Sequence, residues 1–268
     1  MTLSRLGAER VTVGYGGDPV VRDLTLDVPD GLVTSIVGPN GCGKSTLLRT
    51  LARLLRPSSG RVRLDGGSID TLATREVSRR LALLPQSPTA PDGLLVRDLV
   101  GRGRHPHQRW FRQWSPQDEE VVEHALRMTD TWELRDRALD QLSGGQRQRA
   151  WIAMTLAQDT DLVLLDEPTT FLDLAHQVEV LDLVARLNRE RGRTVVMVLH
   201  DLNLAARYSD LVVVMKDGLV VTQGSPREVF TVELLAAVFG LEADVLDDPR
   251  TGLPVVVPVS APAPAARL

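Results

Sequence analysis

The segment "GPNGCGKS" (residues 38–45) combines glycines, a lysine and a hydroxyl side chain in the pattern G-x-x-x-x-G-K-[ST]. It follows the apolar run "LVTSIV" and precedes "KSTLLRTLARLL", whose leucines recur at helical spacing. A loop between a strand and a helix can turn its backbone N–H groups around phosphate oxygens, and the helix N-terminus adds a favourable field. The Lys44 ammonium can reach the terminal phosphates, and the Ser45 hydroxyl can ligate Mg²⁺. The segment therefore predicts a nucleotide phosphate site.

Two acidic residues end the apolar run "LVLLDEP" at residues 162–168. Asp166, at the end of a strand, can hold Mg²⁺ through water opposite a phosphate loop. The adjacent Glu167 can orient or deprotonate an attacking water, which is typically worth about 10²–10⁴-fold in rate. The sequence has no Asn-Lys-x-Asp element after a strand, which a guanine-specific protein would carry. The pair therefore indicates hydrolysis of ATP.

The stretch "LSGGQ" (residues 142–146) places two glycines in front of "RQRAWIAMTLAQ", which otherwise reads as an uninterrupted helix. Each glycine in a helix interior costs about 1 kcal/mol relative to alanine. Ser143 is a good helix N-cap, and Gly144 and Gly145 leave no side chains over the first-turn N–H groups. This helix terminus is therefore predicted to accept an anion.

Strands and helices alternate around these residues, as expected for a mostly parallel α/β sheet. The polar, arginine-rich residues 88–141 are interpreted as a helical insertion, in which Ser115 caps a helix and Pro116 occupies its first turn. A hairpin is predicted around Asp217 and Gly218. A second hairpin is predicted within "ADVLDDPRTGLPVVVPV", and the end "SAPAPAARL" is expected to be disordered.

Composition limits the classes of protein that fit these 268 residues. Hydrophobic residues make up 43% and charged residues 25%, as in soluble globular proteins, and the net charge of −4 gives no reason to expect nucleic acid as a partner. Cys42 is the single cysteine, which excludes an internal disulfide, and it is expected to be a packing residue of the loop. We find neither a secretory signal nor a run of ~20 apolar residues. The chain is expected to be cytoplasmic, or to reach membranes through a partner.

These patterns resemble the ATP-binding-cassette (ABC) ATPases, with which the chain shares seven ordered elements between about residues 10 and 224. Tyr15 resembles the aromatic residue that stacks on adenine, and Gln86 resembles the glutamine that senses Mg²⁺ and the γ-phosphate. Residues 142–146 match the family signature, Asp173 resembles the D-loop aspartate, and His200 resembles the switch histidine. The resemblance implies that ATP is bound by Tyr15, Gly38, Pro39, Asn40, Gly41, Cys42, Gly43, Lys44, Ser45, Thr46, Ser143, Gly144, Gly145, Gln146 and Asp173. It implies catalytic roles for Glu167, His200 and Gln86, and Mg²⁺ ligation by Ser45, Gln86 and Asp166.

The family fold implied is a RecA-like, mostly parallel sheet core with an N-terminal antiparallel β subdomain and a helical signature subdomain. The ATPase domain would then span residues 1–242, with the helical subdomain at about 88–158. Residues 243–268 would form the C-terminal hairpin and a flexible tail. In this family the signature meets the γ-phosphate held by a second subunit, so the chain is expected to form a head-to-tail homodimer. ATP closes that dimer and hydrolysis reopens it, with Glu167 as base and His200 holding the γ-phosphate.

The segment "GRGRHPHQRWFRQW" (residues 101–114) mixes arginine, histidine and aromatic residues. Alone it is compatible with nucleic-acid stacking or with a metal site at His105 and His107, although two histidines are weak evidence for metal. The preferred hypothesis is a docking surface for a membrane subunit around Trp110 and Trp114, whose arginines could also face anionic lipid.

The class of ABC protein follows from what the chain lacks. Long coiled-coil segments and a second cassette are absent, which excludes chromosome-type and translation-type members. "EPTTFLDLAHQ" and residues 101–126 are similar to the cassettes of bacterial ferric-siderophore importers. The resemblance implies a permease, an extracytoplasmic substrate-binding protein and a peripheral position on the cytoplasmic side of the cell membrane. Haem or cobalamin as cargo, and a non-transport regulatory ATPase, remain the alternatives.

Overall fold

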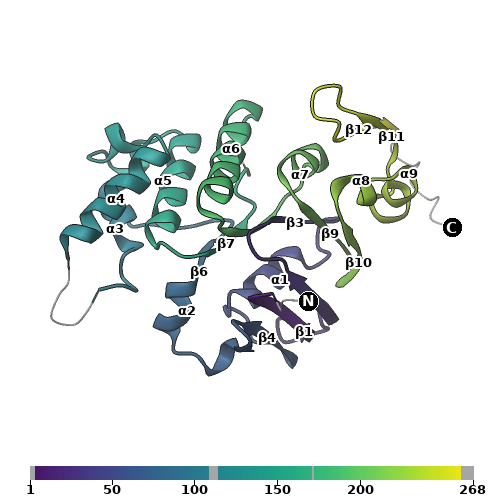
Figure 1. Ribbon diagram of the computed structural model, residues 1–268, viewed down its shortest axis with the longest axis horizontal. Coiled ribbons are helices and arrows are strands. Elements are labelled where there is room, and N and C mark those ends of the chain that lie inside the picture. Colours follow the sequence, from purple (N-terminus) through teal and green to yellow (C-terminus); the bar gives the residue numbers. More distant parts are fainter. Residues whose placement is uncertain (1–3, 109–113, 171, 261–268) are drawn as a thin grey trace. The chain divides into compact units, whose positions relative to one another are not determined.

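The computed structural model describes residues 4–108, 114–170 and 172–260, and the chain divides into two compact units. The first unit comprises residues 1–66 and 198–268, and the second comprises residues 67–197. Figure 1 labels most of their helices and strands. The elements of the first unit are β1 Leu6–Val13, β2 Val21–Val28, β3 Val33–Val37, α1 Lys44–Leu51, β4 Ser59–Leu64, α7 Leu202–Tyr208, β9 Leu211–Lys216, β10 Leu219–Gly224, α8 Pro226–Val229, α9 Val232–Leu234, a π-helical turn Leu235–Phe239, β11 Glu242–Asp247 and β12 Pro254–Ser260. The elements of the second unit are β5 Gly67–Ser68, α2 Thr74–Arg80, β6 Leu81–Leu84, α3 Val96–Arg102, α4 Pro116–Met128, α5 Gly144–Ala157, β7 Leu162–Asp166, α6 Leu174–Arg191 and β8 Thr194–Val198, with 3₁₀ turns at Ile69–Thr71, Trp132–Leu134 and Leu139–Gln141.

Two kinds of sheet occur in the first unit. Strands β2, β1 and β4 pair antiparallel in that order, and β2 alternates between buried and exposed residues. Strand β3 pairs parallel with β9 and is buried throughout, as expected for a strand covered on both faces. Strands β9 and β10 form the predicted hairpin, in which Asp217 and Gly218 both have positive φ (51° and 82°). Two such residues fit a type I′ turn, which matches the twist of the flanking strands.

The second unit carries strands β8, β7 and β6 in that order, and β6 and β7 pair parallel. All five residues of β7 are buried, since its run "LVLLD" is apolar up to the final aspartate. Helices α3, α4 and α5 lie side by side in this unit (Figure 1). The predicted fold class, α/β with an antiparallel β subdomain and a helical region, is confirmed.

Helix α4 begins as the sequence predicts. Ser115 caps it in a reciprocal capping box with Asp118, and Pro116 occupies its first turn. The carboxylate of Asp118 also accepts a 2.8 Å hydrogen bond from Nε of Arg104, and both side chains are less than a tenth exposed. Nη1 of Arg104 donates to the carbonyl oxygen of Ala157 at the end of α5. Burial raises the pKa of Asp118, but hydrogen bonds from Ser115 and Arg104 outweigh it and hold that pKa below its ordinary value. This buried ion pair therefore ties α4 to α5.

Replacing Arg104 by methionine is expected to lower the free energy of unfolding by about 3–5 kcal/mol, because it leaves the Asp118 carboxylate buried without its partner. The matched control is Arg97→Met, which breaks the exposed 2.6 Å pair of Arg97 with Asp136. That change is expected to cost about 0–1 kcal/mol. Urea unfolding of both variants gives the comparison, and equal losses would contradict a stabilising role for the buried pair. Because the native pKa of Asp118 is lowered, its contribution is present at neutral pH and is lost as the pH falls through that native pKa.

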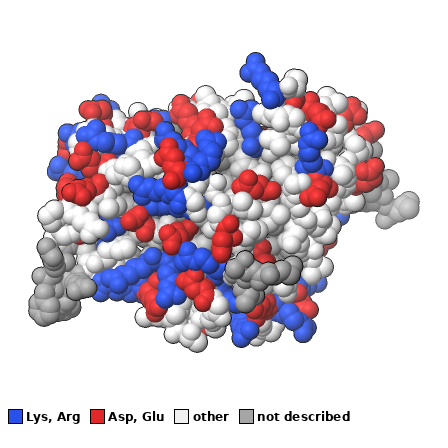
Figure 2. All heavy atoms as spheres, viewed as in Figure 1, with Lys and Arg blue, Asp and Glu red and all other residues white. Residues whose placement is uncertain are grey.

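The predicted C-terminal hairpin is confirmed, since β11 and β12 pair antiparallel. Asn203 on α7 exchanges two hydrogen bonds with the backbone of Val256 on β12: its Nδ2 donates at 3.1 Å and its Oδ1 accepts at 2.7 Å. The predicted disordered end comprises residues 260–268; Ser260 is instead the last residue of β12, where it pairs with β11, and residues 261–268 lie outside the described residues. The domain limits at residues 88, 158 and 242 stay predictions. Among the described helices, none combines the length and the apolar character that crossing a membrane requires. On the face seen in Figure 2, acidic and basic side chains are interspersed.

Candidate nucleotide site

The phosphate loop joins β3 to α1, and its shape depends on glycine. Gly38, Gly41 and Gly43 have φ values of 153°, 78° and 102°, which residues with side chains rarely adopt. A Cβ at Gly38 would lie 2.1 Å from the carbonyl oxygen of Met215, far inside van der Waals contact. The loop conformation is therefore restricted to this sequence pattern, as predicted from residues 38–45.

Lys44 opens helix α1 and is only 5% exposed. Its Nζ donates to the carbonyl oxygens of Gly38, at 2.8 Å, and of Pro39, at 3.0 Å, so the ammonium lies across the loop. Cys42 is buried, and burial raises the pKa of its thiol. A buried thiol of raised pKa is unreactive at neutral pH, which is consistent with the packing role predicted for Cys42.

Tyr15 lies beside this loop, with its hydroxyl oxygen 3.4 Å from Oγ1 of Thr46. The residue is 60% exposed, so the ring is open to a stacking partner. His200, in the same unit, is exposed and immediately precedes Asp201, which caps helix α7 through a 2.9 Å hydrogen bond from the N–H of Leu204. The first unit therefore holds the loop, Tyr15 and His200.

The acidic strand end lies in the second unit. Asp166 is the last residue of β7 and is 1% exposed, and Glu167 is 8% exposed. Oε2 of Glu167 accepts hydrogen bonds from Nε2 of Gln86, at 2.7 Å, and from Oγ1 of Thr170, at 2.9 Å. The structure thus brings together Gln86 and Glu167, which the sequence predicts separately. It adds Thr170, which sequence reasoning missed.

Glu167 has a φ of 52°, in the left-handed region that non-glycine residues seldom occupy. Such backbone conformations cost on the order of 1–3 kcal/mol and persist where the surrounding structure enforces them, often at functional sites. The two hydrogen bonds to Oε2 fix the side chain of this strained residue. Glu167 is therefore held in a defined orientation at the end of β7.

The signature helix α5 begins at Gly144 and confirms the predicted cap. The Ser143 hydroxyl accepts from the N–H of Gln146, and the Gln146 side chain accepts from the N–H of Ser143. Gly144 is exposed, and no atom of the described residues lies within 4 Å of the position its Cβ would take. Gly145 is buried, and its Cβ would lie 2.7 Å from Cδ2 of His176. The space left open by the first glycine is available to an anion, whereas the second glycine makes room for a side chain of the same chain.

Asp173 caps helix α6 and is bonded twice by the same residue. Its Oδ1 accepts from the backbone N–H of His176, at 3.0 Å, and lies 2.7 Å from Nδ1 of the His176 ring. The backbone hydrogen bond, followed by the side-chain one, lowers the pKa of Asp173. The D-loop aspartate is therefore an ionised, oriented carboxylate next to the signature helix.

Comparison with known proteins identifies the family. The family model described as ABC transporter matches residues 21–170. The chain belongs to the ABC transporter family. It is 51% identical to the ferric enterobactin transport ATP-binding protein FepC of Escherichia coli, over 98% of this chain and 97% of that protein. A solved metal-chelate-type ABC transporter in an inward-facing conformation matches with a TM-score of 0.83 and 30% identity, covering 97% of this chain and 98% of that one. A solved dimeric bacterial ABC transporter cassette matches with a TM-score of 0.73 and 28% identity, over 82% of this chain and 98% of that one.

The segment that the sequence suggests as the docking surface of this ABC protein is described in part. Trp110 lies within residues 109–113, outside the described residues. Trp114 is 44% exposed, packs over Gly101, and donates from Nε1 to Glu119 at 2.8 Å. Nε2 of His107 lies 2.7 Å from the carbonyl oxygen of Gln158. Within the described ranges no three His, Cys, Asp or Glu side chains gather closely enough to hold a metal ion, so the alternative of a histidine metal site gains no support.

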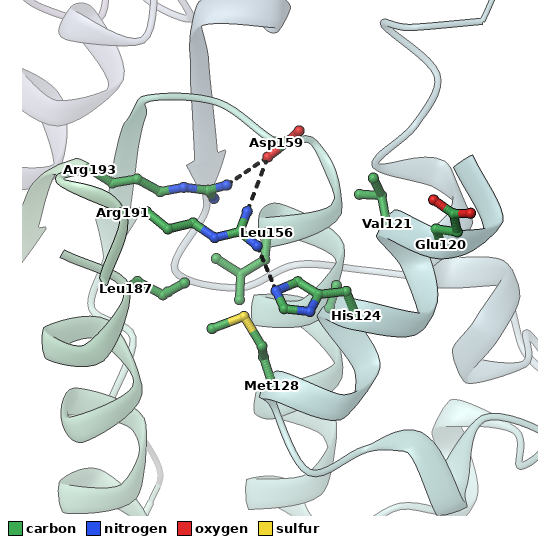
Figure 3. A pocket seen from close by; sticks show the side chains of 10 residues that line it. Glu120, Val121, His124, Met128, Leu156, Asp159, Leu187, Arg191 and Arg193 are labelled. Atoms are coloured by element: carbon green, nitrogen blue, oxygen red, sulfur yellow. Dashed lines mark hydrogen bonds and ion pairs between the residues drawn. The ribbon is translucent and has the colours of Figure 1, made fainter. Parts of the chain in front are cut away.

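A separate pocket of about 150 Å³ lies at the ends of α4, α5 and α6 (Figure 3). Asp159 pairs with Arg193 at 2.7 Å and with Arg191 at 3.6 Å, and Arg191 donates to Nε2 of His124 at 2.6 Å. Burial and then the two arginine charges lower the pKa of His124, which suits a neutral ring accepting a hydrogen bond. None of the ABC motif residues lines this pocket, and its Asp159 is paired with both Arg191 and Arg193. The ion pairs and the hydrogen bond of this pocket are best explained as structural contacts that hold the helices together.

Proposed function

We propose that the chain is the ATP-hydrolysing, energy-coupling subunit of a bacterial importer of ferric siderophores. The observation that carries the hydrolytic part is the buried Glu167 carboxylate, held at Oε2 by Gln86 and Thr170. Membership of the ABC transporter family supports ATP as the nucleotide. The phosphate loop (residues 38–46) binds its phosphates, and Tyr15 stacks on its adenine.

Mg²⁺ fits the proposed ligands because all of them can offer oxygen, the ligand atom that this hard cation prefers. They are the Ser45 hydroxyl, the Gln86 amide and the carboxylate of Asp166, which is buried at the end of β7. When bound, the ion neutralises charge on the transferred phosphoryl group. Gln86 donates to Glu167 from Nε2, so its amide oxygen Oε1 stays available as a ligand.

Glu167 is the proposed base for hydrolysis. Glu167 accepts a proton from a water molecule as the water oxygen forms a bond to the γ-phosphorus. The bond between the γ-phosphorus and the bridging oxygen breaks, and the electron pair leaves with ADP. His200 holds the γ-phosphate during this step. Gln86 and Thr170 keep the carboxylate oriented.

The signature is proposed to act on the nucleotide of a second copy of the chain. Gly144 is exposed and open, and Ser143 caps the helix, so the terminus can face an external phosphate. A two-fold homodimer would place this terminus and Asp173 against the partner's ATP, and the dimeric cassette similar to this chain supports such an arrangement. ATP then favours the closed dimer because its γ-phosphate contacts both copies, and hydrolysis removes those contacts.

The proposed cargo and the other proposed partners are inferred from proteins that are similar to this chain. The similar protein from Escherichia coli is a ferric enterobactin transport protein, and the similar solved transporter is of the metal-chelate type. A ferric siderophore is therefore the favoured cargo, with haem and cobalamin as alternatives. The chain would sit on the cytoplasmic face of the membrane beneath a dimeric permease, which receives cargo from an extracytoplasmic binding protein.

The proposal is tested by growth of a strain that lacks this chain, under iron chelation, with ferric siderophore, haem or cobalamin supplied in turn. Complementation with the wild-type chain is expected to restore siderophore use, and complementation with Glu167→Gln is not. A growth defect only with haem or only with cobalamin would support the importer function and would identify that compound as the cargo in place of a siderophore. Normal growth under all three conditions would favour the non-transport ATPase.

Replacing Trp114 by alanine is expected to weaken recruitment of the chain to membranes that contain its permease, with ATP affinity unchanged, because the half-exposed ring lies in the proposed docking segment. Trp132→Ala is the control, since that ring is sandwiched between Arg127 and Arg135 at 4.4 and 4.2 Å. Co-sedimentation with permease-containing vesicles measures recruitment. A loss of ATP affinity, or equal loss of recruitment in both variants, would contradict docking through Trp114.

A further inference from the structure

The second glycine of the signature is buried against the ring of His176. A Cβ on Gly145 would lie 2.7 Å from Cδ2, 3.2 Å from Cγ and 3.3 Å from Nε2 of that ring. Real Cβ atoms essentially never approach another heavy atom to 2.7 Å, so the ring and an alanine at position 145 cannot share this space without a shift. At Gly144 the equivalent space is open.

The ring of His176 is fixed by the D-loop. Its Nδ1 lies 2.7 Å from Oδ1 of Asp173, and its backbone N–H donates to the same oxygen. One residue thus contacts two of the motifs proposed to face the second copy of the chain, the D-loop aspartate and the signature helix.

Two further contacts hold α5 to the segment after β7. Nε2 of Gln148 donates to the carbonyl oxygen of Pro168 at 2.8 Å, and Nη1 of Arg149 donates to Glu179 at 2.8 Å. Both lie in the second turn of the helix, whereas His176 reaches its N-terminal end. The ring of His176 therefore links the N-terminus of α5 to Asp173.

We propose that His176 is a positioning residue that holds the signature helix in register with Asp173, so that both meet the partner's nucleotide as one rigid surface. This inference rests on the proposed function, in which the signature acts across a dimer. It assigns different tasks to the two glycines: Gly144 leaves room for the phosphate, and Gly145 leaves room for His176.

A double-mutant cycle between positions 145 and 176 tests this assignment. The variants Gly145→Ala, His176→Ala and the double variant are made in the Glu167→Gln chain, and two quantities are measured. One is the melting temperature without nucleotide, and the other is the ATP concentration that half-saturates dimer formation. Gly145→Ala is expected to lower the melting temperature and to raise that concentration by about ten-fold or more, a coupling typical of residues in contact. Adding His176→Ala is expected to bring both quantities to those of the His176→Ala single variant, because it removes the ring that the new Cβ strikes and Gly145→Ala then costs nothing further.

Gly144→Ala is the matched control. Among the described residues its Cβ meets nothing within 4 Å, so its defect in ATP-driven dimerisation should add to that of His176→Ala and should not be relieved by it. His176→Phe separates the two contacts of the ring, because phenylalanine fills the same space but cannot bond Asp173. We expect it to keep the melting temperature and to raise the ATP concentration for dimerisation, which a purely structural residue would not do.

Additive effects of the substitutions at positions 145 and 176 would overturn the inference. Gly145 would then be explained, like Gly144, as leaving room for the phosphate of the nucleotide. A His176→Ala chain that dimerises at the wild-type ATP concentration would also overturn the inference. Failure of the proposed function would give a different result, because the chain would then neither hydrolyse ATP nor form a dimer with ATP. In that case the melting-temperature cycle still decides whether His176 and Gly145 are coupled.

Discussion

Replacing Glu167 by glutamine is expected to lower the rate of ATP hydrolysis by about 10²–10⁴-fold while leaving ATP affinity unchanged. Glutamine has the shape of glutamate but cannot accept a proton from the attacking water. Two side-chain hydrogen bonds reach Glu167 at Oε2, from Gln86 and Thr170. An amide oxygen at the same position can accept both, so the substitution removes the base without moving its surroundings.

Steady-state phosphate release measures the rate, and titration with a fluorescent ATP analogue measures the affinity. The matched control is Glu133→Gln on the exposed turn after α4, which is expected to hydrolyse ATP at the wild-type rate. A Glu167→Gln chain with more than about a tenth of wild-type activity would assign the base to another residue, since a general base accounts for at least about 10²-fold.

Replacing Lys44 by alanine is expected to lower ATP affinity by about 10–100-fold, because a hydrogen bond to a charged group contributes about 1.5–3 kcal/mol. Lys44 and Lys216 are the only lysines in the sequence, so its remaining basic side chains are arginines. The ammonium of Lys44 fits between the Gly38 and Pro39 carbonyl oxygens, a space suited to a compact point charge. Lys44→Arg is therefore expected to lower the affinity as well.

Lys216→Ala is the control for lost charge, since Lys216 is half-buried at the end of β9 and donates to the carbonyl oxygen of Ala237. Affinity for ATP and melting temperature are measured together on all three variants. A Lys44→Ala chain that keeps its melting temperature and still binds ATP with wild-type affinity would contradict the assignment of residues 38–46 as the phosphate site.

The parts of the fold that could be predicted are those with a local signal. The run "LVLLD" is apolar at every position up to its aspartate, and it forms the fully buried strand β7. Ser115 and Ser143 precede helical patterns, and both act as N-caps. Asp217 and Gly218 favour positive φ, and they form the turn between β9 and β10. In each case neighbouring residues decide the outcome.

The contacts that organise the candidate site could not be predicted, because they join residues far apart in the sequence. Gln86 and Glu167 are 81 residues apart, and no periodic pattern connects them. The buried ion pair of Arg104 with Asp118 could not be predicted, because the arginines of this segment suggest an exposed surface. The contact of His176 with Gly145 changes the explanation of a motif that the sequence does reveal. A glycine pair indicates that side chains are excluded, but not which neighbour excludes them.

ATP-driven closure of a dimer is the central claim, and the mass of the Glu167→Gln chain in solution tests it most directly. Light scattering during size-exclusion chromatography would be recorded with Mg²⁺ and ATP, and separately with Mg²⁺ and ADP. Twice the mass of a single chain with ATP, and the mass of a single chain with ADP, is the predicted result. A mass that is the same with both nucleotides would contradict a dimer closed by the γ-phosphate.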